Sequence, residues 1–218
     1  MTGLPATVIL MADGPGHRWS GEGDRHLAPV RGEPLIHRTL RALAECGISD
    51  PVVFTRDSAV SGKAVKFAPP FRLPSLLAAC AATRDLWRGD VLFLAGDVVF
   101  SGTALPSLLA RAPGTPPWAF FGKRGPNRHT GKPWAEIYGF RVAGEGTGPA
   151  LAAMRALAAG QYRRKGFREL YRALKGLPPD RPFLPAGPGF HAVPDWTDDV
   201  DTAEDLANLT RFLERREG

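Results

Sequence analysis

Cysteine is scarce in this chain of 218 residues, which contains only Cys46 and Cys80. Both lie in apolar helical patterns, so they are most simply two reduced core thiols. No grouping of cysteine and histidine has the spacing of a zinc site. The scarcity therefore excludes a disulfide framework and a zinc-based fold, and a chain of this length can bury a large core without either.

Long apolar runs are also absent, since no stretch of about 18 apolar residues occurs and no transmembrane helix is expected. The first residues carry no basic leader, and their apolar run is short. This pattern predicts a first β-strand rather than a signal peptide. We therefore expect a cytoplasmic protein.

The overall composition is that of an ordinary globular protein, with 44% hydrophobic and 23% charged residues. The net charge is +6 and the isoelectric point about 9.7. A basic balance suits acidic partners such as phosphates, nucleic acid or an anionic membrane surface, and does not choose among them.

Strand-like and helix-like segments alternate along the whole chain. Strands are expected at 6–12, 51–55, 90–97, 118–123, 135–142 and 189–193. Helices are expected between Pro34 and Gly47 and at 75–87, 103–111, 148–159, 163–175 and 203–214. This alternation predicts the α/β class, with one doubly wound, mostly parallel, Rossmann-like sheet. We expect a single domain over residues 1–218, in which 118–190 is a candidate acceptor-binding insertion or cap.

A glycine-rich loop follows the first strand. Gly14 and Gly16 allow the backbone to approach a phosphate closely, and Arg18 and Arg25 add permanent positive charge. Ligands of open α/β sheets bind where such loops leave the carboxyl ends of strands. The spacing matches neither the dinucleotide fingerprint nor a P-loop, so a flexible surface turn stays open as the alternative.

Carboxylates follow two later segments. Asp97 ends the apolar strand 90–97, which directs it into the same crevice as the glycine-rich loop. Asp199 and Asp201 alternate on an extended segment, so their side chains share one face. Mg²⁺ prefers such oxygen ligands, together with phosphates and waters. The alternatives are that Asp97 caps a turn and that the late acids only begin a helix.

These motifs together resemble the nucleotidyltransferase superfamily, and in particular its MobA-like and sugar-phosphate nucleotidyltransferase-like members. The resemblance rests on Gly14-Pro15-Gly16-His17-Arg18, Arg25-His26-Leu27, Gly32-Glu33-Pro34-Leu35-Ile36, Gly96-Asp97 and Asp199-Val200-Asp201-Thr202-Ala203-Glu204-Asp205-Leu206. Asp13 stands where the family usually has a small residue, Arg25 where it has lysine and Ala203 where it has proline. No resemblance covers the region of about 118–190.

The resemblance implies a fold related to the GT-A type and a set of site residues. A nucleoside triphosphate would lie against Ala12, Asp13, Gly14, Gly16, His17, Arg18 and Ser75. Arg18 and Arg25 would stabilise the phosphates, while Asp97 and one of Asp199 and Asp201 would hold Mg²⁺. Asp13 would repel phosphates unless it turns away, helps to hold the metal or pairs with an arginine.

The implied reaction is Mg²⁺-dependent transfer of a nucleotidyl group from the triphosphate to a small phosphorylated acceptor, such as a sugar 1-phosphate, with release of pyrophosphate. The basic loop 123–132 would close over the acceptor or form a solvated surface loop. Two alternatives stay open. One is a sugar-nucleotide-dependent glycosyltransferase of related fold, disfavoured because Asp97-Val98-Val99 replaces the expected Asp-x-Asp. The other is a non-catalytic relative that binds nucleotide or nucleic acid, although no nucleic-acid motif supports it.

Overall fold

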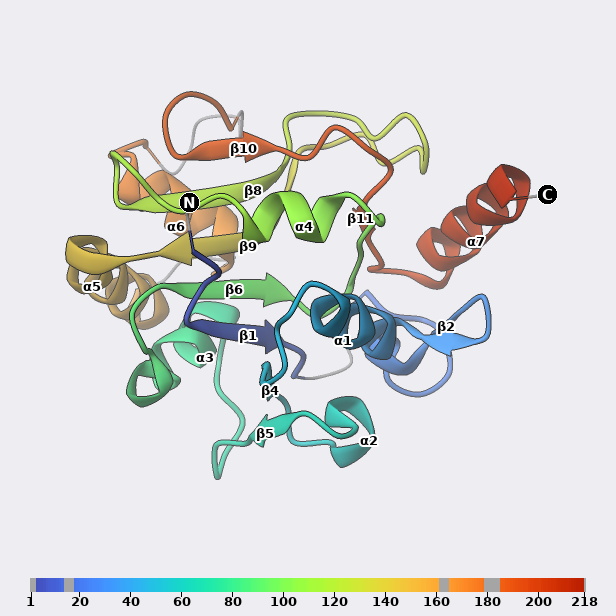
Figure 1. Cartoon of the computed structure of the whole chain (residues 1–218), viewed down its shortest axis with the longest axis horizontal. Coiled ribbons are helices and arrows are strands. Elements are labelled where there is room, and N and C mark those ends of the chain that lie inside the picture. Colours follow the sequence, from blue (N-terminus) through green and yellow to red (C-terminus); the bar gives the residue numbers. More distant parts are fainter. Residues whose placement is uncertain (1–2, 14–17, 161–164, 179–184, 218) are drawn as a thin grey trace.

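A mixed seven-stranded sheet forms the centre of the protein (Figure 1). The computed structural model describes residues 3–13, 18–160, 165–178 and 185–217. The sheet has the order β10-β8-β9-β6-β1-β4-β5. Its strands are β1 (Thr7–Met11), β4 (Val52–Phe54), β5 (Val65–Phe67), β6 (Val91–Ala95), β8 (Trp118–Lys123), β9 (Glu136–Val142) and β10 (Phe190–Ala192). Only β9 runs antiparallel to its neighbours among these strands, which confirms the predicted α/β class and mostly parallel sheet.

Helices cover both faces of the sheet, which explains the continuous apolar runs of its central strands. The helices are α1 (Leu35–Glu45), α2 (Ser58–Ser61), α3 (Leu76–Ala82), α4 (Ala104–Leu109), α5 (Thr147–Ala159), α6 (Phe167–Leu174) and α7 (Ala203–Glu217). On β1, Ile9 and Met11 pack in one core with α3, α5 and α6. Val8 and Leu10 face the opposite core, with α1 and α4. The predicted segment 118–190 thus contributes strands to the sheet and helices to one face.

Two short antiparallel pairs complete the framework. β2 (Pro29–Val30) and β3 (Glu33–Pro34) form a hairpin whose turn residues, Arg31 and Gly32, have φ values of 56° and 81°. Positive φ at both positions is typical of a type I′ turn, which suits the twist of a hairpin.

The second pair joins distant parts of the chain. β7 (Val98–Val99) pairs with β11 (Asp198–Asp199), and the Val200 amide donates to the Asp97 carbonyl at 2.8 Å. This pairing places the late acidic segment beside the end of β6.

The structure also corrects several predicted elements. The sequence did not predict α2 and β5, and the expected helix over 75–87 is α3 followed by a 3₁₀ turn at Arg84–Leu86. β5 was missed because it is a short edge strand with little apolar periodicity; Val65 is 56% exposed. Cys80 is a buried free thiol as expected, whereas Cys46 is free but only half-buried. Within the described residues, no helix is long and apolar enough to cross a membrane.

Candidate active site

Six of the predicted site residues line one cavity of about 770 Å³ at the carboxyl end of β6. Its wall includes side chains from the glycine-rich loop, from the end of β6 and from the late acidic segment. These are Arg18, Arg25, Asp97, Asp199 and Asp201. Ser75 lies on the same cavity, next to Pro74 and Leu76. Segments that are far apart in the sequence are therefore close enough to bind one ligand.

Close packing between strands explains the glycine that precedes Asp97. A Cβ atom on Gly96 would lie 2.7 Å from the Cβ of Ala12 and 2.8 Å from the Met11 carbonyl oxygen. Such contacts are too close for any larger residue, so only glycine fits where the chain after β6 lies beside the end of β1. Ala12 itself is fully buried in the core, and neither Ala12 nor Asp13 lines the cavity.

Arg25 lies between two of the predicted metal-binding acids. Its Nη2 atom is 2.9 Å from Asp97 Oδ2, and its Nη1 atom is 3.4 Å from Asp201 Oδ1. A local turn directs it there, because Asp24 caps the 3₁₀ turn Arg25–Leu27 and accepts a hydrogen bond from the His26 amide at 2.8 Å. The buried His26 ring also contacts Asp24. Arg25 therefore contacts acids directly, where the resemblance implied phosphates.

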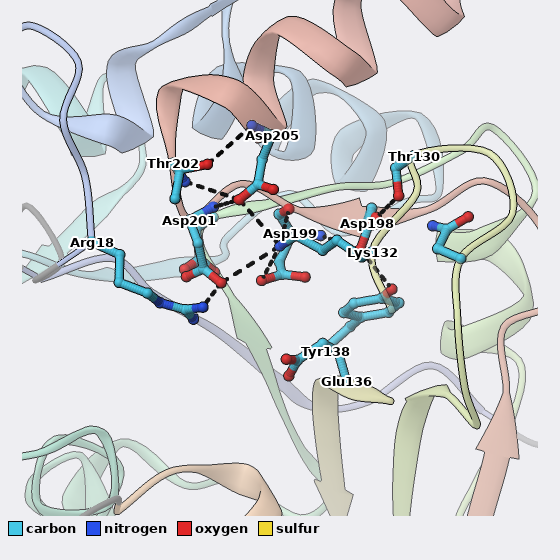
Figure 2. Close-up of polar contacts among 12 residues, drawn as sticks. Arg18, Thr130, Lys132, Glu136, Tyr138, Asp198, Asp199, Asp201, Thr202 and Asp205 are labelled. Atoms are coloured by element: carbon cyan, nitrogen blue, oxygen red, sulfur yellow. Dashed lines mark hydrogen bonds and ion pairs between the residues drawn. The ribbon is translucent and has the colours of Figure 1, made fainter. Parts of the chain in front are cut away.

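Asp201 has three cationic partners, Arg18, Arg25 and Lys132. Figure 2 shows Arg18 and Lys132 beside it. Arg18 forms an ion pair with its Oδ2 atom, and Lys132 Nζ lies 3.5 Å from the same oxygen. Burial by itself would raise the pKa of Asp201. The hydrogen bond with Asp199 and the charges of Lys132, Arg18 and Arg25 outweigh burial and lower this pKa. Asp201 is therefore an anion held by cations.

Asp199, two residues away, has different surroundings. Its Oδ2 atom lies 2.8 Å from Lys132 Nζ, but its Oδ1 atom is buried without a hydrogen-bond partner among the described residues. Burial and the negative charge of Asp201 raise the pKa of Asp199 well above its usual range, although Lys132 opposes them. An unpartnered buried oxygen is costly unless something binds it.

Lys132 contacts the predicted metal-binding acids, which the sequence did not reveal. It was expected in a loop that closes over the acceptor or lies in solvent, yet its side chain is only 8% exposed. Its ammonium contacts Asp199, Asp201 and Asp205, and donates to the Asp199 carbonyl at 2.8 Å. Figure 2 shows Lys132 among these acids. Long-range contacts between this loop and the late acidic segment bring them together, so no local sequence pattern could have identified this cluster.

The same loop is anchored at further points against the segment that carries the acids. Asn127 Nδ2 donates to the Thr197 carbonyl at 3.3 Å, and the Thr130 hydroxyl donates to Asp198. Lys123 donates to the Asp195 carbonyl. The loop thus packs on the late acidic segment.

The glycine-rich loop is only partly described. Gly14, Gly16 and His17 lie outside the described residues. Asp13 pairs with Arg56, whose Nε atom is 3.0 Å from Asp13 Oδ1. Of the three alternatives for Asp13, the structure shows pairing with an arginine, which offsets its repulsion of phosphates.

The wall opposite the acids comes from β9 and the beginning of α6. Glu136, Ile137 and residues 165–169 line this side. Glu136 Oε1 lies 3.4 Å from Arg168 Nη2, and burial raises the pKa of Glu136 against the opposing charge of Arg168. The Ser75 hydroxyl accepts a hydrogen bond from the Ala78 amide at 3.2 Å, which confirms it as the N-cap of α3.

The acids partly fit a magnesium site. Carboxylate oxygens are ligands that Mg²⁺ prefers, and Asp199 Oδ1 has no other partner. Within the described residues, however, no three His, Cys, Asp or Glu side chains form a ready ligand group. Two of the predicted ligands, Asp97 and Asp201, are instead bridged by Arg25. Asp199 therefore has one carboxylate oxygen without a partner among the described residues, whereas Asp97 and Asp201 become ligands only when Arg25 moves.

Comparison with known proteins identifies the family. The model of the MobA-like NTP transferase domain matches residues 7–177. The chain belongs to this family. Its membership confirms the resemblance to the nucleotidyltransferase superfamily, whose members are enzymes that transfer nucleotidyl groups.

Individual relatives agree with this family. A stretch of 50 residues is 40% identical to a 2-C-methyl-D-erythritol 4-phosphate cytidylyltransferase from Symbiobacterium thermophilum, covering 23% of this chain and 21% of that enzyme. The match thus spans about a fifth of the relative's length.

Two solved structures share the fold over nearly the whole chain. The inositol-1-phosphate CTP transferase from T. maritima superposes with a TM-score of 0.67 and 11% identity, covering 98% of each chain. A protein assigned as a glucose-1-phosphate thymidylyltransferase from Bacillus anthracis superposes with a TM-score of 0.64 and 13% identity, covering 97% of this chain and 96% of that one. They support the Rossmann-like nucleotidyltransferase fold.

Proposed function

We propose that this protein transfers a nucleotidyl group from a nucleoside triphosphate to a small phosphorylated acceptor and releases pyrophosphate, with Mg²⁺ as cofactor. The observation that carries the proposal is that Arg18 and Arg25 share one cavity with Asp97, Asp199 and Asp201. Phosphates need positive charge and a divalent ion needs carboxylates, and this cavity offers both. The relatives named above act on a nucleoside triphosphate and a phosphorylated small molecule, as their names state.

The nucleotide side of the cavity is assigned to the glycine-rich loop and the start of α3. Ala12, Asp13, Gly14, Gly16, His17 and Arg18 would surround the phosphates, and Ser75 would lie near the base. Arg18 is 44% exposed, so it can follow a phosphate by rotating its side chain. Ser75 already serves as a helix cap, which leaves its second lone pair for a ligand.

The acceptor side is assigned to the wall opposite the acids. Within a single domain over 1–218, the segment 118–190 supplies Glu136, Lys165 and Arg168 to this wall. Arg168 brings positive charge and Glu136 an acceptor for hydroxyl or amine groups. No contact with nucleic acid or a membrane is part of the proposal, and a cytoplasmic location stays a prediction.

The reaction would be attack of an acceptor phosphate oxygen on the α-phosphorus, with pyrophosphate leaving. The attacking oxygen is ionised near neutral pH, so no protein nucleophile is required. Arg18 and Arg25 would stabilise the charge that develops on the pyrophosphate. Asp97 and one or both late acids would hold the ion, which when bound supplies charge neutralisation at the reacting phosphates. The other site residues act by holding the two substrates in line.

A pyrophosphate-release screen tests this function. The four common nucleoside triphosphates are each offered to a panel of phosphorylated acceptors with Mg²⁺, and we expect turnover with at least one pair. Asp97→Asn should lower that turnover by about 100-fold or more while the protein stays folded. Full turnover by the folded variant would contradict the metal assignment.

The same assays separate the alternatives. Release of a nucleoside diphosphate from a sugar nucleotide would support a glycosyltransferase instead. Salt-sensitive binding of nucleic acid without turnover of any triphosphate would support a non-catalytic relative.

A further inference from the structure

The Arg25 side chain occupies a position that a divalent cation would need. Both of its terminal nitrogens face carboxylates, Nη2 toward Asp97 at 2.9 Å and Nη1 toward Asp201 at 3.4 Å. The side chains of both acids are largely buried, with 16% and 10% exposed. Two buried like charges repel each other, and a cation between them offsets that repulsion. The guanidinium thus provides the charge compensation that a metal ion would otherwise supply.

The contacts of Arg25 also allow its side chain to move away from the two acids. Its Nε atom is buried without a hydrogen-bond partner among the described residues, so part of the guanidinium is poorly satisfied where it lies. The side chain lines the cavity and is 17% exposed. The phosphates of a bound triphosphate would offer charged oxygens that match a guanidinium in shape and charge.

Lys132 provides the internal comparison. It also neutralises the acids, but it is not part of the cavity wall and donates to the backbone of Asp199 as well as to carboxylates. A ligand in the cavity therefore meets Arg25 and not Lys132. Of the two cations, only Arg25 is placed to exchange its acidic partners for substrate.

From these contacts we infer that Arg25 is a built-in competitor of the divalent ion, displaced from Asp97 and Asp201 when a triphosphate binds. The inference rests on the proposed function for the identity of the triphosphate. Arg25 blocks the ion until phosphates draw the guanidinium away, so ion and triphosphate bind cooperatively. Such coupling is reciprocal, because each ligand favours the same arrangement of Arg25.

The test measures binding of Mn²⁺ alone, without triphosphate or acceptor, by electron paramagnetic resonance at low ionic strength. Mn²⁺ suits the same carboxylate ligands as Mg²⁺ and is detected directly. Arg25→Gln should bind Mn²⁺ about tenfold more tightly than the unsubstituted protein, because a charge-assisted contact no longer competes. Arg25→Lys, with one ammonium in place of two nitrogens, should give a smaller gain.

Two controls make the result specific. Arg41→Gln removes the same charge from a surface arginine that also contacts two carboxylates, those of Glu33 and Glu45, and it should leave Mn²⁺ affinity unchanged. Combining Arg25→Gln with Asp97→Asn should abolish the gain in Mn²⁺ affinity. Equal affinity in Arg25→Gln and the unsubstituted protein, with both folded by circular dichroism, would overturn the inference. So would an equal gain in Arg41→Gln.

The proposed function can fail separately. If no triphosphate and acceptor pair releases pyrophosphate with the unsubstituted protein, the reaction is wrong, yet the Mn²⁺ affinities remain interpretable because they need no turnover. If turnover is found, Arg25→Gln should combine tighter Mn²⁺ binding with slower pyrophosphate release. A residue with a merely structural role would not move these two quantities in opposite directions.

Discussion

Two basic segments look alike in the sequence but have different surroundings in the structure. The first, 18–25, carries Arg18 and Arg25, which line the cavity and have side-chain exposures of 44% and 17%. The second, 123–132, carries Lys123 and Lys132, which are buried against the late acidic segment. Positive charge predicted a phosphate contact in the first segment and, in the second, either an acceptor contact or a solvated surface loop. Only in the first do the charges face the cavity.

The difference shows that the partners of a basic residue decide its role. The cavity-facing arginines have acidic partners that a substrate can replace. The buried lysines hold parts of the fold together, since removing a charge from a buried ion pair leaves its partner uncompensated. Substitutions in the first segment should therefore affect turnover, whereas substitutions in the second should affect stability.

Lys132→Met is expected to have the largest effect. It leaves Asp199, Asp201 and Asp205 without their shared cation, so the free energy of unfolding should fall by about 3 kcal/mol. In a chain of this size, such a loss corresponds to a decrease of roughly 6–12 °C in Tm. Urea and thermal unfolding followed by circular dichroism measure both quantities.

Lys132→Arg is the matched variant, because it keeps the charge and should retain much of the stability. If Lys132→Met unfolded at the same urea concentration as the unsubstituted protein, the contrast between the two segments would not hold.

Arg18→Gln should show the opposite pattern. Loss of one hydrogen-bond donor to the charge that develops in the transition state typically lowers the rate about 100-fold. Pyrophosphate release should therefore slow by that order. The Arg18–Asp201 pair is half open to solvent on the arginine side, so the free energy of unfolding should change by less than about 0.5 kcal/mol. The surface variant Arg41→Gln should change neither quantity appreciably. A large loss of stability in Arg18→Gln, or normal turnover, would mean that Arg18 stabilises the fold, as the buried lysines do, and does not act on the substrate.

The sequence predicted those parts of the fold that depend on local pattern. The central strands β1 and β6 are continuous apolar runs because both faces of the sheet are covered, and this pattern is visible in a single sequence. Ser75 was correctly expected to cap a helix, since capping involves only neighbouring residues. The short elements α2 and β5 were missed because their length gives too little periodicity.

The sequence predicted that several of these residues would lie together, but not the contacts that they make. The order of motifs predicted that Arg18, Asp97 and Asp201 would meet, because the carboxyl ends of parallel strands share one edge. The position of Arg25 between two acids depends on the pairing of β7 with β11, which joins residues about a hundred positions apart. No local pattern encodes such a contact, and the same holds for Lys132.

The smallest expected effect concerns Asp195, which lies beside Lys123 in the packed region. Its carboxylate accepts a hydrogen bond from the Thr197 amide at 2.8 Å and others from the hydroxyls of Ser101 and Thr103. Burial would raise the pKa of Asp195, but these hydrogen bonds outweigh it and lower this pKa below the ordinary value of 3.8. The ionised form is therefore favoured in the folded protein.

This direction fixes how Asp195 contributes to stability at different pH values. A carboxyl group with a lowered pKa in the folded state stabilises the protein fully above its unfolded pKa, and the contribution is lost as the pH falls through the folded pKa. Asp195→Asn should therefore cost about 1 kcal/mol at pH 7. The difference from the unsubstituted protein should shrink as the pH falls below about 4.

Urea unfolding of both proteins at a series of pH values measures this difference directly. Ser101→Ala removes one of the hydrogen bonds that lower the pKa, so its effect should shrink over the same pH range. A difference that stayed constant down to pH 3 would mean that Asp195 contributes through packing and not through its charge. In that case the hydrogen bonds around Asp195 would stabilise its neutral and ionised forms equally, and charge would matter only among the acids that face Lys132.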